Sequence, residues 1–151
     1  MTNLEERIGK MMKEKNISIE CIQHEPVYTI QAAAKALGIK ESHTVKSLVL
    51  KTKEEKFVVL LLPGDKKVDW KLLAQKLRTK NLELAKPEEV LNLVGCEVGC
   101  VPPFGHFTDL PIYMDKDLLK KDVLYFNPGV HNKSIKVKAW DLRKLSNPKI
   151  I

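Results

Sequence analysis

The sequence lacks several features that would each place it in a particular class of protein. It has only three cysteines, Cys21, Cys96 and Cys100, an odd number and too few for the disulfide framework of a small secreted protein. No run of about 18 apolar residues occurs, which argues against a transmembrane helix. The charged start, MTNLEERIGKMMKEKN, has no apolar segment typical of a signal peptide. These absences predict a protein of the reducing cytoplasm that contacts no membrane.

Motifs for common cofactors are also missing. The sequence contains no Walker loop, GxGxxG or GxSxG, so ATP, dinucleotide and serine-hydrolase chemistry have no local support. The four histidines are scattered, and Cys96 and Cys100 have no second pair to complete a zinc site. We therefore expect no metal and no other cofactor. Either cysteine could act as a nucleophile with His106 or His131; the alternative is that both are small residues packed in a loop.

What the sequence does contain is enough apolar residues for one domain and an excess of positive charge. The 151 residues are 44% hydrophobic, which predicts a single domain over 1–151 that buries about 68–70% of its unfolded surface. Against 19 acidic residues there are 26 Lys and Arg, a net charge of +7. The excess is concentrated in 40–80, with a net +6, and in 131–151, with a net +5.

These two basic segments have two interpretations. If they adjoin in the fold, they form a patch that attracts phosphates. However, 23 of the basic residues are lysine and only 3 are arginine, which also suits a solubilising surface and disfavours base-specific reading. The chain has only nine aromatic residues, so a stacking platform for single-stranded nucleic acid is disfavoured as well.

Hydrophobic periodicity and turn residues predict a mixed α/β fold. Thr29 and Asp69 are suited to helix N-caps, Gly38 to a helix end, and Pro87 to a first helical turn. The apolar run at 57–62 predicts a strand buried on both faces. Helices are predicted over 3–15, 30–37, 70–77, 88–93, 116–120 and 139–145, and strands over 17–23, 45–51, 56–62, 82–85, 112–115, 123–126 and 134–137.

Two local features could carry chemistry. Residues 95–105 read GCEVGCVPPFG, and the glycines and adjacent prolines predict a loop with a defined backbone path. Lys46 begins an apolar strand in TVKSLVL. From the mouth of a pocket it could reach a phosphate or a carbonyl group, or it could extend into water.

Several motifs occur together in the order typical of one family. They are His24-x-Pro26, Lys46-Ser47-Leu48, the turn at 61–65 followed by Asp69, the segment 85–90, Gly95-x3-Gly99-x3-Pro103-x-Gly105, and a tail with 126–129, His131-Asn132 and Asp141-Leu142. With these motifs the chain resembles the YbaK / prolyl-tRNA synthetase-associated (INS-type) editing-domain family over about residues 15–147. The resemblance implies a central, mostly antiparallel, barrel-like mixed sheet flanked by helices.

The resemblance also implies an activity: hydrolysis of the ester between a wrong amino acid and the 3′-terminal adenosine of tRNA. Lys46 matches the lysine that holds the phosphate and 3′ end of the acceptor. Gly99 and Pro103 match the ends of the GxxxP loop, whose backbone amides face the ester, and Gly129 matches the glycine of a late loop across the pocket. These four are the expected catalytic residues. The expected substrate-binding residues are His24, Cys100, Val101, Pro102, His131 and Asn132.

Departures from the family pattern bear on the substrate. Cys100 and Pro102 stand where cysteinyl-specific members have glycine and serine, and Asn127 and Ser134 stand where they have serine and aspartate. We therefore expect an alanyl or similarly small group, with alanine or cysteine on tRNA for proline as the candidates. The implied partners are the tRNA acceptor 3′ end and prolyl-tRNA synthetase. The alternative is a non-catalytic module of the same fold that binds tRNA or a synthetase.

Overall fold

A computed structural model describes residues 4–104 and 109–151 of the chain. The fold is mixed α/β, and four of the six pairings between described strands are antiparallel. The α-helices are α1 (Leu4–Glu14), α2 (Ile30–Leu37), α3 (Trp70–Lys76), α4 (Pro87–Val94) and α5 (Ala139–Ser146), with 3₁₀ helices η1 (Glu41–His43) and η3 (Lys116–Lys120). The strands are β1 (Glu20–Gln23), β2 (Val45–Thr52), β3 (Phe57–Pro63), β4 (Leu82–Leu84), β5 (Ile112–Met114), β6 (Val123–Phe126), β7 (Lys133–Lys138) and β8 (Lys149–Ile150).

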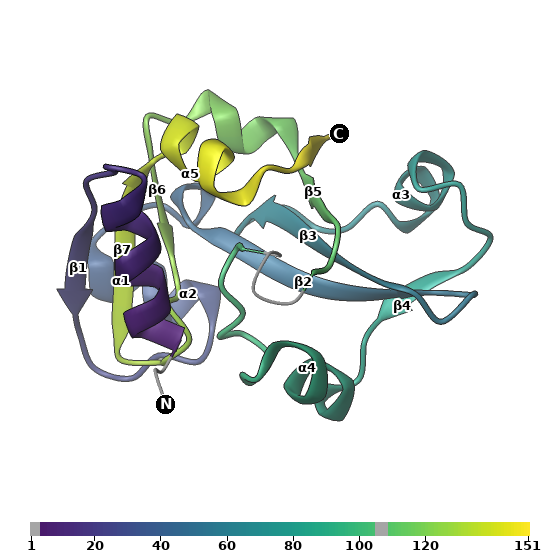
Figure 1. The fold of residues 1–151 in the computed structure, drawn as a ribbon, viewed down its shortest axis with the longest axis horizontal. Helices are drawn as coiled ribbons and strands as arrows, with labels where there is room; N and C mark the ends of the chain where they lie inside the picture. The colour runs from purple at the N-terminus through teal and green to yellow at the C-terminus, as the bar shows by residue number, and fades with distance from the viewer. Residues whose placement is uncertain (1–3, 105–108) are drawn as a thin grey trace.

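The strands form two sheets rather than one barrel-like sheet, which corrects the expectation from the resemblance. One sheet has the order β1-β7-β6 and the other β4-β2-β3-β5-β8 (Figure 1). Between the described strands, the sheets join only at an isolated parallel bridge from Thr44 to Tyr125. A barrel needs every strand to pair on both sides, but β4 pairs with β2 only over Leu50–Thr52. The first half of β2 therefore has an open side.

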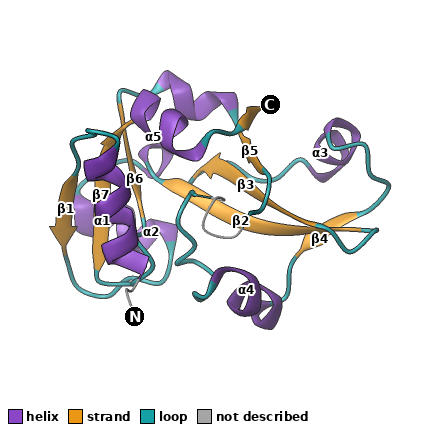
Figure 2. Ribbon diagram, in the orientation of Figure 1, coloured by secondary structure: helices purple, strands orange, loops and turns teal. Residues whose placement is uncertain are grey.

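The three-stranded sheet presents one face to the core and the other to a cavity. Side chains of a strand alternate between faces, and the residues turned toward α1 are Leu124, Phe126, Ile135 and Val137, packed with Ile8, Met11 and Met12. Tyr125 and Ser134 belong to the opposite face and line a cavity. The helix α1 lies against the three-stranded sheet (Figure 2), so one face of the sheet is buried and the other lines the cavity.

The apolar run in β3 is buried on both faces, as predicted. Val59 and Leu61 belong to the main core, whereas Leu60 and Leu62 pack with Leu73 of α3. A separate apolar cluster beneath the 95–104 loop includes Val49 of β2 and Val90 of α4. The β2–β3 hairpin thus lies between apolar clusters, and other elements pack against each of its faces.

The predicted caps of α2 and α3 are confirmed. The Thr29 hydroxyl accepts a hydrogen bond from the Ala32 N–H at 3.0 Å, and the Asp69 carboxylate accepts one from Leu72 N–H at 3.1 Å. Gly38 ends α2 with φ +67°. The strand β8 was not predicted, because two residues are too short to show a period and their pairing with β5 is a long-range contact.

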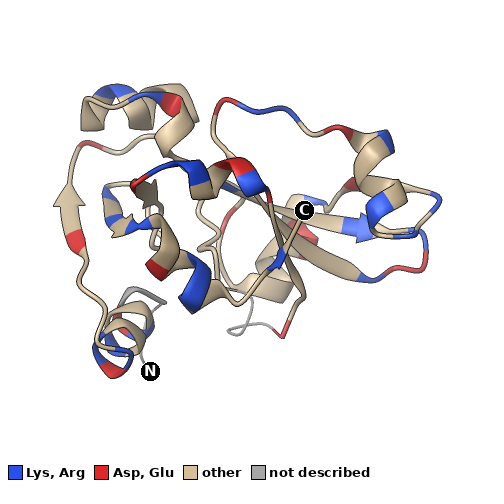
Figure 3. Cartoon of the chain, turned by 90° about the horizontal axis from the view of Figure 1, so that it is seen from above, with Lys and Arg blue, Asp and Glu red and all other residues tan. Residues whose placement is uncertain are grey.

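The basic residues do not gather at one place, and Figure 3 shows Lys and Arg spread over several elements of the fold. The second basic segment contributes β7 to the three-stranded sheet and β8 to the other sheet. Some of its lysines and those of the first segment are in ion pairs; Lys51 binds Glu89 at 2.9 Å and Lys66 binds Asp115 at 2.7 Å. No helix in the described ranges has both the length and the apolar character needed to cross a bilayer.

The turn after β3 gives a test of this packing. The Gly64 N–H donates to the Thr44 carbonyl at 3.0 Å. A Cβ at position 64 would meet the Thr44 hydroxyl and lie 2.7 Å from both the Glu41 carbonyl oxygen and Ile30 Cγ2. We expect Gly64→Ala to lower the free energy of unfolding by about 1–3 kcal/mol, because the backbone must shift to relieve the overlap.

The matched control is Gly9→Ala in the interior of α1, where a Cβ meets nothing within 4 Å. It should raise the free energy of unfolding by about 1 kcal/mol through helix propensity. Urea denaturation measures both variants. Equal stability of Gly64→Ala and the parent protein would contradict the packing described for this turn.

Candidate active site

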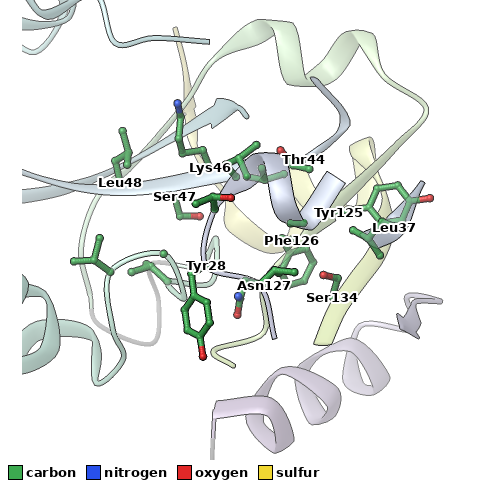
Figure 4. Close-up of a pocket in the computed structure, with 18 residues that line it drawn as sticks. Tyr28, Leu37, Thr44, Lys46, Ser47, Leu48, Tyr125, Phe126, Asn127 and Ser134 are labelled. Carbon is green, nitrogen blue, oxygen red and sulfur yellow. The ribbon is translucent and has the colours of Figure 1, made fainter. Parts of the chain in front are cut away.

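A cavity of about 180 Å³ lies between α2, the open side of β2, the end of β6 and the loop at 98–101 (Figure 4). We call it the Gly99 cavity, and we call residues 95–104 the Gly99 loop and residues 127–132 the late loop. The lining residues are Val27–Ile30, Ala33 and Leu37, then Thr44–Leu48, then Val98, Gly99 and Val101, and finally Tyr125–Asn127 and Ser134. Most of these side chains are apolar, so the cavity suits a small group with few polar atoms.

Among the described residues, this lining has no carboxylate, imidazole or thiol group. The described ranges also hold no cluster of three or more His, Cys, Asp or Glu that could bind a metal ion. The polar atoms available are the Asn127 amide, the hydroxyls, the Lys46 ammonium and the backbone. The described lining thus offers hydrogen-bonding groups, with no carboxylate or thiolate.

Lys46 lies at the edge of the cavity, but its ammonium group is turned away from it. Its Nζ donates to the backbone carbonyl of Lys66 at 2.8 Å, and Figure 4 shows the side chain extending away from Tyr28 and Asn127. Strand alternation explains this direction, because Ser47 takes the cavity side of β2. The ammonium group is thus held at the rim, where a phosphate outside the cavity could reach it.

The carbonyl that holds Lys46 is itself fixed by a charged cluster. Lys66 Nζ donates to Asp115 at 2.7 Å and to Asp117 at 3.1 Å, and Asp115 is buried. The hydrogen bond to Asp115 raises the pKa of Lys66 above its ordinary value, with Asp117 adding to the effect. Hydrogen bonds from Lys120 and Lys66 lower the pKa of Asp117 to about 2. Both shifts favour the charged forms of Lys66 and Asp117 near neutral pH, and the ion pairs anchor the turn that positions Lys46.

The Gly99 loop has two backbone N–H groups that no described residue accepts from. Gly99 has φ +90°, a conformation in which a side chain is strained. The Cys100 N–H is used within the loop and donates to the Glu97 carbonyl at 3.0 Å. No hydrogen bond among the described residues engages the N–H of Gly99 or Val101, and both residues line the cavity. Two free donors at the wall of a cavity can bind an oxygen that gains negative charge.

The prolines of this loop are buried and anchor it to the core. Pro102 is buried and Pro103 is almost completely so. The Pro103 carbonyl accepts a hydrogen bond from the buried Ser146 hydroxyl of α5 at 2.7 Å. Neither proline lines the Gly99 cavity. Their contribution is to fix the backbone path that leads away from Val101.

The late loop shapes the opposite wall. The Gly129 N–H donates to Asn127 Oδ1 at 2.7 Å, and Gly129 has φ +103°. This local turn engages the Gly129 amide within the loop and orients the Asn127 side chain, which does line the cavity. Gly129 itself lies outside the lining, so its conformation acts on the cavity through Asn127.

His131 joins the two loops just outside the cavity. Its Nε2 lies 3.2 Å from Cys100 Sγ and 3.1 Å from the Glu97 carboxylate, and its Nδ1 donates to the Val27 carbonyl at 3.1 Å. Its ring also packs against Tyr28, with centroids 4.4 Å apart. Cys100 and His131 are thus brought together, as the nucleophile hypothesis requires.

Cys100 is nevertheless poorly placed to attack a ligand. It is only 2% exposed and packs in the apolar cluster under the loop. Burial raises the pKa of the Cys100 thiol, and burial, followed by the neighbouring Cys100, raises the pKa of Cys96 to about 12. A reactive cysteine needs a thiolate that is accessible to its target, so the contact with His131 is better suited to holding the loops together.

His24 forms a second pair, with a residue that does line the cavity. Its Nδ1 donates to the Glu25 carbonyl at 2.7 Å, which leaves Nε2 to accept from the Ser134 hydroxyl at 2.8 Å. Ser134 is buried and faces the cavity. The backbone N–H of His24 also donates to the carbonyl of Asn132, an exposed residue of the late loop.

The ten residues expected at the site therefore divide into two groups. Lys46, Gly99 and Val101 line the cavity, and the other seven are not among its lining residues. Gly105 and His106, which belong to the motifs above, lie outside the described residues. Sequence reasoning did not assign a role to Ser47 or Tyr28, although Ser47 stands in the Lys46-Ser47-Leu48 motif and strand alternation puts it on the face opposite Lys46.

Comparisons with known proteins agree on one family. The profile of the family described as aminoacyl-tRNA editing domain matches residues 24–145. The multifunctional Ser/Thr-tRNA deacylase ProXp-y of Escherichia coli K12 is 27% identical, over 97% of this chain and 90% of that protein. A proline–tRNA ligase of Caldicellulosiruptor bescii is 32% identical over 80% of this chain, which corresponds to 21% of the ligase. A solved structure described as a candidate trans-editing enzyme for prolyl tRNA synthetase superposes with a TM-score of 0.86 at 25% identity, over 100% of this chain and 96% of the other.

Thiol labelling tests whether Cys100 is accessible. Cys21 is exposed, whereas Cys96 and Cys100 are buried, so we expect one thiol of the native protein to react rapidly with iodoacetamide and the other two to be protected. Mass spectrometry of labelled peptides measures this. Cys21→Ser should remove the rapid phase, and all three thiols of the parent protein should react in urea. Rapid labelling of Cys100 in the native protein would contradict the structural role and restore the nucleophile hypothesis.

Proposed function

The chain belongs to the aminoacyl-tRNA editing domain family, and from this premise we propose that it acts in trans as a deacylase of mischarged tRNA. Its substrate would be a small amino acid esterified to tRNA, with alanine or cysteine on tRNA for proline as the first candidates. The named function of the Escherichia coli relative adds serine and threonine to the substrates worth testing. Since charged tRNA is made in the cytoplasm, we place the activity there.

The observation that carries this proposal is the pair of free N–H groups, on Gly99 and Val101, at the wall of a small cavity. In ester hydrolysis, the oxygen of water forms a bond to the acyl carbon and the carbonyl oxygen becomes negatively charged. Donors fixed in advance lower the energy of that charge, and one such donor is worth about 10²–10³ in rate. The carbonyl double bond re-forms as the bond to the ribose oxygen breaks, the ribose oxygen takes the proton that the attacking water loses, and the free amino acid leaves.

This mechanism needs no side-chain nucleophile. An aminoacyl ester is already activated, so a water held near the acyl carbon and a site for the negative oxygen are the main requirements. Asn127 and Ser134 are two of the cavity polar groups held by hydrogen bonds to neighbours, and we assign them to orienting the water or the acyl group. His24, Cys100, Pro102, Pro103, Gly129, His131 and Asn132 then act as positioning residues that hold the two loops.

Lys46 is proposed to bind a phosphate of the acceptor end. Its ammonium group now donates to a neutral carbonyl at the cavity rim, and a phosphate oxygen would be a stronger, charge-assisted acceptor. The remaining lysines of the two basic segments would steer tRNA by long-range attraction. Prolyl-tRNA synthetase is the proposed functional partner, because a part of one such synthetase resembles this chain.

The first test is deacylation of a panel of alanyl-, cysteinyl-, seryl-, threonyl- and prolyl-tRNA. We expect release of a small amino acid, and we expect Lys46→Ala to lower kcat/KM by about 100-fold, because a charge-assisted hydrogen bond of about 3 kcal/mol is lost. Lys56→Ala removes the same charge from an exposed position at the far end of the hairpin and should keep nearly full activity. Hydrolysis of no substrate would favour the non-catalytic tRNA- or synthetase-binding module.

A second pair of variants tests the backbone donors. Gly99 and Gly95 both have positive φ and no atom within 4 Å of an added Cβ, so Gly99→Ala and Gly95→Ala should each lose about 1–2 kcal/mol of stability through backbone strain. Only Gly99→Ala shifts a donor at the cavity wall, so we expect deacylation to fall by about 100-fold in Gly99→Ala alone. Equal activity of the two variants, measured at a temperature where both are folded, would refute the role of the Gly99 loop.

A further inference from the structure

The open side of β2 places backbone hydrogen-bonding groups along the Gly99 cavity. In β3, the Val59 N–H donates to Pro111 and the Leu61 carbonyl accepts from Asp115, both on the side away from β2. The even-numbered residues of β3 therefore bond to the even-numbered residues of β2, given the pairing of Lys46 with Leu62 and Leu48 with Leu60.

The odd-numbered residues of β2 must then direct their backbone groups to the other side. The Ala85 N–H donates to the Val49 carbonyl there, and β4 continues the pairing only from Leu50. At the other end, Thr44 bridges to Tyr125. Between these two attachments the backbone carbonyls of Val45 and Ser47 face the gap, and both residues line the Gly99 cavity.

The Ser47 side chain adds a second, independent sign of a missing partner. Its hydroxyl oxygen is buried and makes no hydrogen bond with any described residue, which costs about 1–3 kcal/mol. Figure 4 shows Ser47 beside Lys46 at the β2 wall of the cavity. Rotation about the Cα–Cβ bond moves a serine hydroxyl between staggered positions, so a ligand in the cavity could supply the partner.

The charge of the lining decides what kind of ligand group would bind there. An aminoacyl ester carries a free α-ammonium group, and no carboxylate of the described residues lines the Gly99 cavity to neutralise it. Neutral groups must therefore accept the hydrogen bonds of this ammonium group. The carbonyl groups of an open strand edge are such acceptors, and their spacing is fixed. The Lys46 ammonium would repel a second cation, but it is turned toward Lys66 on the other side.

We propose that the edge of β2 at Val45 and Ser47 is the α-ammonium subsite, in which backbone carbonyls and the Ser47 hydroxyl accept hydrogen bonds from a primary amine. This proposal rests on the proposed function and adds a specificity rule to it. A primary ammonium offers three hydrogens to the edge, whereas the ring nitrogen of proline offers two and carries a carbon in place of the third. Correctly charged prolyl-tRNA is therefore rejected at its amine as well as by its size.

The test uses non-hydrolysable probes, so that binding is measured apart from catalysis. They are RNA acceptor microhelices with a 3′-amino-3′-deoxyadenosine end that carries alanine, N-methylalanine or N-acetylalanine in amide linkage. The side chain is the same in all three, so only the amine differs. We expect the alanyl probe to bind at least about tenfold more tightly than the other two. This difference corresponds to the loss of at least one charge-assisted hydrogen bond in the N-methylalanyl and N-acetylalanyl probes.

Variants link the effect to β2. Ser47→Ala should weaken binding of the alanyl probe by about tenfold and leave binding of the N-acetylalanyl probe unchanged. Ser47→Thr should bind the alanyl probe as the parent protein does, because it keeps the hydroxyl. Ser18→Ala, at an exposed position before β1, is the control and should bind all probes as the parent does. Chemical shift changes of the Ser47 amide on adding the alanyl probe would support the assignment.

Two results overturn the proposal in distinguishable ways. If the alanyl and N-acetylalanyl probes bind equally well, the ammonium subsite is wrong while the deacylase function stands. If no probe binds to the parent protein, the proposed function fails and the subsite fails with it.

Discussion

The pairing of β2 with β3 is the constraint on which the rest of the structure depends. β3 is apolar on both faces, so it must lie inside the sheet with layers on each side, and β2 covers its whole length. The outer side of β2 is then divided between two partners that do not meet, the Thr44–Tyr125 bridge and β4. The gap between them is where the Gly99 cavity forms. A fully paired sheet would leave no backbone groups for a ligand and no space beside the strand.

Around this gap, the groups proposed to contact a ligand belong to the main chain more than to side chains. The Gly99 loop is held in place by a buried proline, by the Pro103–Ser146 hydrogen bond and by the contact of Cys100 with His131. These attachments lie outside the cavity, so the loop can present free N–H groups without relaxing to satisfy them internally. Pre-organised donors of this kind cost no rearrangement when charge develops on a substrate. In the proposed mechanism, they take the place of a carboxylate or thiolate in the described lining.

The elements and caps were predictable because they depend on local patterns. Thr29, Asp69, Gly38 and Pro87 act within one helical turn of their own positions, and each has the predicted role. The roles around the cavity were harder to predict, because they depend on contacts between distant segments. His131 lies 31 residues from Cys100, and His24 lies 110 residues from Ser134. Sequence reasoning offered His131 only as one of two possible partners for either cysteine, and it gave no indication that His24 pairs with Ser134. β8 went unpredicted because its pairing is also long-range.

The sequence by itself determined the element types, the doubly buried strand, the shaped loop at 95–104 and, through its ordered motifs, the family. These follow from propensity, periodicity and short-range geometry, which each residue carries with it. Only the tertiary structure decided that the strands form two sheets instead of a barrel, that Lys46 turns to Lys66 at the rim, and that Ser47 faces the cavity without a partner. The physical reason is that pairing on the outer side of β2 depends on the positions of β4 and β6. Those positions are fixed by the packing of the whole core.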